Sequence, residues 1–339
     1  MVKTMRISVA AWSPEYSAEI DLGPEEVTVE QVDCSVEPGP WEPRSPGDIG
    51  ALADMPLAFV DGTRRIDARL FLSDNGSAPV SGVAGSVGVG AVVCDPAPGG
   101  PGGRRTSNGE PRRARVAEMR IDRFIAAGDG TRVSLSGSAG LTYQPLPVPG
   151  TGNNIDSLVG AVHESMRVRE AQLALEMATD HLVFSDGPFA VMRPEAVRVV
   201  AFIKSHQRRY LDEDHEQIIG ALGCGERTPL FAFGEPRPRY SWYLRLCDLQ
   251  ADDHLWHGLV RCEAPASVGL AGVIELADAS ASLLPQFASL PHWDPRAPQN
   301  LVPVAGLEKR LRHLLGDREL VYRMIRSAAN KSANEGNGG

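Results

Sequence analysis

Runs of apolar residues separated by polar stretches predict several strands in the first half of the chain. The runs 56–60 and 66–72 flank Asp61-Gly62-Thr63-Arg64-Arg65, a pattern typical of a β-hairpin with the polar stretch as its turn. A short alternating segment, 5–11, precedes them. Further strands are predicted at 83–93, 116–125 and 132–135. Together these segments favour an antiparallel sheet.

Helical spacing replaces the strand pattern after residue 150. Asp156 is placed to cap a helix that runs to about Thr179, in which apolar residues recur at Leu158, Val162, Met166, Leu173 and Met177. Strands and helices then alternate along the chain. The remaining predicted strands are 181–185, 197–203, 241–246 and 255–262, and the remaining helices lie near 270–284 and 306–325.

This order of elements predicts an α/β fold with a mixed, largely antiparallel sheet and flanking helices. Residues 1–50, which are rich in Pro, Glu and Gly near their end, form an N-terminal extension in this prediction, and residues 51–326 form the main domain. The segment 95–115 is dense in Pro, Gly and Arg and predicts a flexible insert. Residues 327–339 are expected to be a disordered tail.

Composition restricts the location and the partners of the protein. No apolar run approaches the roughly 20 residues that a membrane helix needs, and no signal peptide pattern is present, so we expect a cytoplasmic protein without a membrane anchor. The five cysteines are scattered without metal-binding spacing and indicate reduced thiols. The net charge of -9 argues against a protein that coats nucleic acid indiscriminately, but it is compatible with a local basic surface.

Two aspartates stand where apolar strands are predicted to end. Asp61 and Asp186 each follow an apolar run and precede a glycine, which places a carboxylate at the exposed end of a buried element. Asp-Gly is also one of the commonest turn dipeptides, so a purely structural role is the simplest alternative for each aspartate.

Glu170 is the third candidate acid. Met166 and Glu170 fall on one face of the predicted helix, so the Glu170 carboxylate can point inward. The alternative is a residue at the boundary of the core that pairs with Arg167 or Arg169. Glu176 is a rival acid on the same helix.

Three converging carboxylates suit a hard divalent cation. Mg²⁺ and Mn²⁺ prefer oxygen ligands, and phosphodiester hydrolysis commonly uses two such ions to activate water and to stabilise the leaving oxygen. Without metal the carboxylates repel one another and at least one pKa rises, so such a cluster rarely persists for stability alone. The sequence therefore predicts a metal-dependent hydrolase with Asp61, Glu170 and Asp186 as its catalytic and metal-binding residues.

These residues stand in a series of short motifs that resembles the NurA family of DNA-repair nucleases. The motifs are FVDGT at 59–63, RVRE at 167–170, LVFSDGP at 182–188, VAFIKS at 200–205, WYLR at 242–245 and LVRCE at 259–263. The resemblance covers about residues 56–325 and rests on the order of the motifs.

The resemblance implies an RNase H-like core that binds Mn²⁺ or Mg²⁺ through an aspartate on the opening strand, a glutamate on the helix and a second aspartate on a following strand. These positions match Asp61, Glu170 and Asp186. Family members cut single-stranded DNA exonucleolytically in the 5′ to 3′ direction, nick duplex DNA, and act as homodimers beside a HerA-type hexameric ATPase that translocates DNA. The sequence departs from the pattern at Thr63 and Pro188, where serine is more usual, and at 294–303, where the family generally has a histidine.

Basic and aromatic residues that follow predicted strands are candidates for substrate binding. Lys204, His206 and Arg208 lie after a strand end, where a cation can meet a phosphate, and Tyr243 can stack on a base. The alternatives are solvated loop residues and a core aromatic residue. The chain has no P-loop and no G-x-S-x-G motif, so any DNA motor must be another chain.

Two other functions stay open at this point. One is a binding protein of the same fold whose degraded site only docks DNA or a translocase. Metal-dependent cleavage of DNA would distinguish an active nuclease from such a binding protein. An unrelated hydrolase with a carboxylate metal site would act on small phosphoesters but not on DNA.

Overall fold

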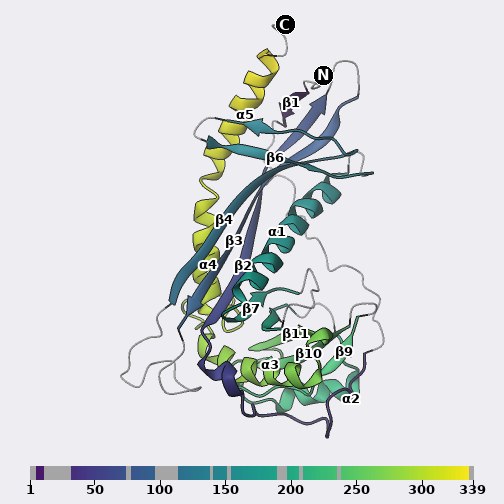
Figure 1. Cartoon of the computed structure of the whole chain (residues 1–339), viewed down its shortest axis with the longest axis vertical. Coiled ribbons are helices and arrows are strands. Elements are labelled where there is room, and N and C mark those ends of the chain that lie inside the picture. The colour runs from purple at the N-terminus through teal and green to yellow at the C-terminus, as the bar shows by residue number, and fades with distance from the viewer. Residues whose placement is uncertain are drawn as a thin grey trace.

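One large mixed sheet runs through the described chain and carries helices on both faces (Figure 1). The structure is a computed structural model that describes residues 5–10, 32–73, 78–95, 114–137, 140–150, 154–188, 197–205, 209–234 and 238–335. The predicted α/β class, with a mixed sheet and flanking helices, is confirmed. In these ranges no helix is both long and apolar enough to cross a membrane.

Most neighbouring strands of the sheet are antiparallel. The strands are β1 Arg6–Val9, β2 Leu57–Ser73, β3 Val80–Cys94, β4 Ala114–Ala127, β5 Leu135–Ser136, β6 Thr142–Pro147, β7 Leu182–Asp186, β8 Val199–Ile203, β9 Phe231–Phe233, β10 Arg239–Arg245 and β11 Leu259–Pro265. Their order across the sheet is β5-β6-β4-β3-β2-β7-β8-β11-β10-β9, and β1 pairs with the end of β2. The parallel pairs are β2 with β7, β7 with β8, and β4 with β6.

Helices cover both faces of the central strands. They are α1 Ile155–Met177, α2 Glu213–Glu216, α3 Leu270–Leu283, α4 Val302–Leu314 and α5 Arg318–Glu335, with short 3-10 helices η2 Gly50–Asp54, η4 Gln217–Ala221, η5 Ala266–Val268 and η6 Leu284–Phe287. Leu173 of α1 belongs to a buried cluster with Val60 of β2, and Leu307 of α4 to another cluster with Phe59. Neighbouring residues of a strand face opposite sides, so α1 and α4 lie on opposite faces of β2.

β2 is one long strand and not the predicted hairpin. Residues 61–65 continue the ladder with β3, in which Asp61 pairs with Gly90 and Arg65 with Ser86, and a bulge follows at Ile66. The hairpin prediction was wrong because β3 is long enough to pair with both apolar runs and with the polar residues between them. These long-range hydrogen bonds override the local turn preference of Asp-Gly. Asp61 therefore lies within a strand.

Several other predictions agree with the structure, and some have different bounds. The strands at 83–93, 116–125, 181–185, 197–203 and 241–246 and the helices near 156–179 and 270–284 correspond to β3, β4, β7, β8, β10, α1 and α3. The prediction of a strand at 132–135 was wrong, since pairing with β6 begins only at Leu135. β6 was not predicted because Pro145 and Pro147 interrupt its sequence. The strand expected at 255–262 begins at Leu259, where the ladder with β10 starts.

The helix predicted at 306–325 is two helices. Gly316 adopts a φ of +83°, which ends α4, and the Asp317 side chain accepts a hydrogen bond from Leu320 N at 2.8 Å at the start of α5. The tail expected from residue 327 is helical as far as Glu335, because Ala328 and Ala329 are buried against the sheet. Residues 336–339 and most of the predicted insert, 96–113, lie outside the described residues.

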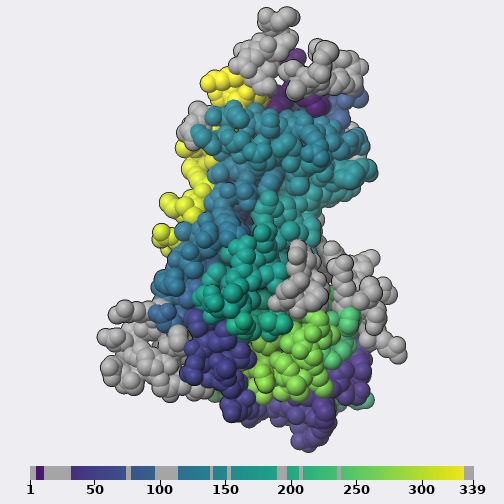
Figure 2. Space-filling view, viewed as in Figure 1, coloured from purple at the N-terminus to yellow at the C-terminus, as the bar shows by residue number. Residues whose placement is uncertain are grey.

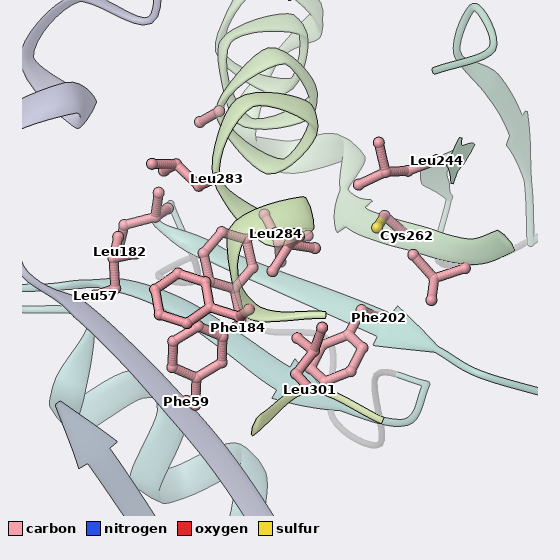
Figure 3. Close-up of a cluster of buried hydrophobic side chains, with 14 of the residues drawn as sticks. Leu57, Phe59, Leu182, Phe184, Phe202, Leu244, Cys262, Leu283, Leu284 and Leu301 are labelled. Carbon is pink, nitrogen blue, oxygen red and sulfur yellow. The ribbon is translucent and has the colours of Figure 1, made fainter. Parts of the chain in front are cut away.

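A buried aromatic pair joins the two central parallel strands. Phe59 of β2 and Phe184 of β7 stack with their ring centroids 5.6 Å apart, and Phe287 packs edge-on against Phe59 at 4.8 Å. Figure 3 shows the pair among leucines from β2, β7 and the C-terminal elements. Burying a phenylalanine side chain contributes about 1.5–3 kcal/mol, so this cluster fixes the register of β2 against β7.

A buried ion network of Glu37, Arg227 and Asp278 connects residues 32–50 with the C-terminal half of the chain. Arg227 donates two hydrogen bonds to the Glu37 carboxylate, at 2.9 and 3.0 Å, and one to Asp278 at 2.7 Å. Burial alone would raise the pKa of Glu37, but the hydrogen bonds and charge of Arg227 hold it below its ordinary value. Figure 2 shows the purple N-terminal residues against the green C-terminal ones at the lower end of the molecule.

Arg227→Ala is expected to lower the free energy of unfolding by about 3–5 kcal/mol, because it removes the cation bonded to the buried Asp278 carboxylate and leaves the buried Glu37 with only Arg44, 3.6 Å away. Arg209→Ala is the control: the Arg209 side chain is 71% exposed and lies 3.6 Å from Glu216, so its loss costs less than about 1 kcal/mol. Urea unfolding measures both values. Equally small changes in the two variants would contradict a stabilising role for the network.

Candidate active site

Asp61 and Asp186 stand side by side on neighbouring parallel strands. The register of β2 and β7 pairs Val60 with Ser185, so the next residue of each strand is an aspartate, and Asp186 is the last residue of β7. Side chains alternate in direction along a strand. Both aspartates therefore project to the face that carries the buried aromatic pair and α4.

Glu170 approaches the same place from the opposite face. It lies on α1, is 8% exposed, and covers Gly62 of β2. A Cβ atom at position 62 would stand 2.9 Å from Glu170 Cδ and 3.0 Å from Met166 Cγ, so only glycine leaves room for the carboxylate. The Gly62 N–H donates to Asp61 Oδ1 at 2.8 Å and also forms a hydrogen bond with Glu170. This one peptide group thus faces carboxylates from both sides of the sheet.

The two faces meet because the sheet has an edge at this point. β7 ends at Asp186, whereas β2 continues to Ser73, and β1 joins the same edge only from Leu70 onward. Among the described strands, none pairs with this edge of β2 at residues 61–68. Side chains from the two faces can therefore approach one another around the backbone of Asp61 and Gly62.

Burial raises the pKa of all three carboxyl groups, and neighbouring carboxylates raise it further. The pKa of Asp61 rises to about 8, first because burial disfavours its charged form and then because Asp186 repels it. Burial and the charges of Asp61 and Asp186 raise the pKa of Glu170 well above its ordinary value. Burial also raises the pKa of Asp186, which Lys204 partly reverses. The structure thus brings the three predicted acids into one electrostatic site.

Lys204 and Asn300 complete the polar surroundings of Asp186. Lys204 directly follows β8, forms an ion pair with Asp186 and donates to Asn300 Oδ1 at 3.0 Å. Asn300 is fully buried, and its Nδ2 donates to Asp294. The sequence predicted Lys204 but not Asn300. The available signal for Asn300 was its place in the stretch 294–303, where the family pattern has a histidine.

A fourth carboxylate, Glu308 of α4, was also not predicted. Its charge raises the pKa of both Asp61 and Asp186. Burial alone would raise the pKa of Glu308, but hydrogen bonds from Arg296 at 2.6 Å and from Arg312 at 2.7 Å hold it below its ordinary value. Glu308 therefore stays ionised beside the site, together with two arginines.

Of the other predicted substrate-binding residues, the structure describes only Tyr243, and Tyr243 does not join this site. Tyr243 is 1% exposed and packs between Phe231 and Trp256, so its ring is unable to stack on a base. The prediction was wrong because β10 lies inside the sheet and is covered on both faces. His206 and Arg208 lie outside the described residues.

The donor chemistry of the site fits a hard divalent cation. Asp61, Glu170 and Asp186 offer only carboxylate oxygens, which Mg²⁺ and Mn²⁺ prefer. Within the described ranges, however, no three His, Cys, Asp or Glu side chains are arranged so that they can hold one metal ion. The Lys204 ammonium supplies the positive charge at Asp186 instead.

Comparisons with known proteins do not assign the site. No protein-family model matches the sequence, and no curated protein shows significant similarity to it. The resemblance to the NurA family stays a prediction from the ordered motifs.

Gly62→Ala is expected to displace the Glu170 carboxylate and to cost about 1–3 kcal/mol of stability, because the added methyl group overlaps it. In a Glu170→Ala background this cost should fall by at least about 0.5 kcal/mol, which a double-mutant cycle measures by urea unfolding. Gly160→Ala is the control, since a Cβ atom at this position of α1 meets nothing within 4 Å and should be neutral or stabilising. Strict additivity in the cycle would contradict the close approach.

Asp61→Asn is expected to stabilise the metal-free protein at pH 8, by more than about 1 kcal/mol, and to leave it unchanged near pH 4. The pKa of Asp61 is about 8 in the folded state, so the folded protein retains a proton that the unfolded chain loses as the pH rises from about 4 to 8. The stability of the wild-type protein therefore falls across this window, and asparagine removes that loss. Urea unfolding in EDTA at both pH values tests this, and a pH-independent difference would argue against it.

Proposed function

We propose that this protein is a metal-dependent deoxyribonuclease that resembles the NurA family and acts on single-stranded DNA. The observation that carries the proposal is the meeting of Asp61, Glu170 and Asp186, from β2, α1 and β7, at one edge of the sheet. Burial raises the pKa of all three, and the charge of Asp186 raises the pKa of Asp61 and Glu170 further, which lowers the stability of the folded protein without metal. A site that binds a divalent cation explains why the chain bears this cost.

The three carboxylates form the metal-binding part of the proposed site. Asp61 and Asp186, which are neighbours on one face, are the proposed first ligands. Glu170 does not form a three-ligand group with them in the described structure, and we propose that it would complete the set when the ion binds. A bound Mn²⁺ or Mg²⁺ supplies the charge that activates water and stabilises the leaving oxygen of a phosphodiester. Gly62 leaves the space that Glu170 needs in this set.

Lys204 is proposed to contact the scissile phosphate. Its ammonium pairs with Asp186, and if Asp186 held a metal ion this ammonium would be available to a phosphate oxygen. The hydrogen bond of 3.0 Å to Asn300 keeps the ammonium at the site during this change of partner. Asn300 thus orients Lys204 without touching the reacting atoms.

The order of the strands supports an RNase H-like core. β2, β3 and β4 form an antiparallel meander, α1 follows, and β7 and β8 lie parallel to β2 on its other side. One aspartate on the opening strand, a glutamate on the helix and a second aspartate on a following strand are the positions that the family resemblance implies. The strands from β9 to β11 extend the sheet beyond this proposed core.

The cellular role rests on the resemblance. We propose 5′ to 3′ exonuclease and endonuclease activity, a cytoplasmic homodimer, and a HerA-type translocase as its partner. The net charge of -9 disfavours tight unaided binding to DNA at physiological salt. A motor that delivers the strand would replace affinity with a high local concentration.

Asp61→Asn and Asp186→Asn are each expected to reduce Mn²⁺-dependent cleavage of end-labelled single-stranded DNA by at least about 100-fold, because each removes a metal ligand. Glu176→Gln is the control: Glu176 lies on the same helix as Glu170, but its side chain is 43% exposed and pairs with Arg120 at 2.6 Å. Gel analysis with and without Mn²⁺ measures the products. Near wild-type cleavage by either aspartate variant would refute the assignment.

A catalytically degraded binding protein is the second candidate function. The ion pair between Lys204 and Asp186 favours it, because the ammonium holds a carboxylate that a metal ion needs. Such a protein would bind single-stranded DNA and give no Mn²⁺-dependent products. Hydrolysis of small phosphoesters but not of DNA would indicate an unrelated hydrolase.

A further inference from the structure

The turn that precedes α4 presents a large aromatic side chain to solvent. Trp293 is 70% exposed, more than any other large apolar residue in the described part of the chain. By contrast, Trp242 is fully buried and donates from its indole to Ser280 at 3.0 Å. The exposed Trp293 ring therefore offers a flat apolar surface that the fold itself does not use.

Hydrogen bonds order the backbone of the turn that carries this ring. The backbone N–H groups of Trp293 and Asp294 both donate to Leu290 O, at 2.8 and 3.1 Å. Arg296 N donates to Asp294 Oδ1 at 2.8 Å. The His292 ring packs against the indole with a centroid distance of 5.0 Å. An aromatic side chain on an ordered backbone loses less conformational freedom when it binds a ligand than one on a mobile loop.

Hydrogen bonds connect the turn to the candidate active site. Asp294, the residue after Trp293, accepts a hydrogen bond from Asn300. Asn300 accepts one from Lys204, and Lys204 pairs with Asp186. Trp293 is therefore next in sequence to the outermost residue of the polar network that reaches Asp186.

Two exposed arginines pair with Glu308 near this turn. The side chain of Arg296, on the same turn, is 50% exposed, and that of Arg312, on α4, is 62% exposed. Both pair with Glu308, and Arg296 also lies 3.6 Å from Asp294 through its Nε, so the N–H donors that remain for phosphate oxygens belong mainly to Arg312. An aromatic platform beside cationic groups is typical of surfaces that bind single-stranded nucleic acid.

The surroundings of Trp293 favour a nucleic acid over a protein partner. Protein interfaces use contiguous apolar patches. The other large exposed apolar residues of the described chain lie mainly on separate elements, such as Phe71 on β2, Val168 on α1 and Leu320 on α5. A single ring among charged groups matches a base and its phosphates better.

We propose that Trp293 stacks on an unpaired base of a DNA strand whose phosphates are bound by Arg296 and Arg312, and that it thereby positions single-stranded DNA at the carboxylate site. This inference rests on the proposed function. In a duplex the faces of the bases are covered by their neighbours, so the turn selects single strands.

The test measures DNA binding without cleavage. Fluorescence anisotropy in EDTA at low salt compares labelled oligo(dT) of about 20 nucleotides with a duplex of the same length. Trp293→Ala is expected to weaken oligo(dT) binding roughly 5- to 100-fold and to leave duplex binding unchanged, whereas Trp293→Phe retains most of the affinity. Phe71→Ala is the matched control, because this 50% exposed ring lies on β2 roughly 30 Å from Asp61 and should have no effect.

Three results would overturn the inference. They are unchanged oligo(dT) binding by Trp293→Ala, an equal loss for single strand and duplex, and no oligo(dT) binding by the wild-type protein. If Trp293→Ala binds oligo(dT) as the wild-type protein does but has a lower mass by light scattering, Trp293 belongs to a contact between copies of the chain. Binding without Mn²⁺-dependent cleavage would refute the nuclease and leave the stacking role, whereas cleavage unaffected by Trp293→Ala would refute only the stacking role.

Discussion

Repulsion between buried carboxylates is the constraint on which the rest of this structure depends. Asp61 and Glu170 are buried, the Asp186 side chain is 14% exposed, and the charge of Asp186 acts on both of the other acids, so the surrounding fold must supply the free energy that keeps them together. Apolar packing on both faces of β2 provides it, with α1 on one side and the aromatic pair with α4 on the other. Phe59 and Phe184 stand two residues before the aspartates, so the strongest packing lies next to the strongest repulsion.

Strand lengths then determine where the acids meet. β7 stops at Asp186 while β2 continues, which creates an edge that side chains from both faces can reach. Gly62 makes this edge thin enough for Glu170, because any larger residue would fill the place of its carboxylate. Lys204 directly follows β8, and Arg296 and Arg312 both pair with Glu308 of α4. The site therefore combines residues where β7 and β8 end with residues inside β2, α1 and α4.

Local patterns predicted much of this arrangement, and long-range pairing accounts for the rest. The helix that carries Glu170 and the strand that ends at Asp186 follow from spacing within about 20 residues. The same local reasoning misplaced Asp61, since a turn preference is visible in two residues but the partner strand that overrides it is not. The N-terminal cap of α1 is Asn154 and not the predicted Asp156, so the helix begins slightly earlier than predicted. Asn300 and Glu308 reach the site because α4 packs against the sheet there. The spacing predicts the helix itself, but not the place in the fold against which it packs.

The Arg227 network has a consequence for the order in which the chain acquires its structure. Glu37 and Arg227 are 190 positions apart, and Arg227 and Asp278 are 51 apart. During translation, residues 32–50 leave the ribosome long before either partner has been made, whereas β2 and β3 can pair as soon as both have emerged. The segment that is synthesised first must therefore wait, exposed to chaperones and proteases, until the C-terminal half arrives to bind it.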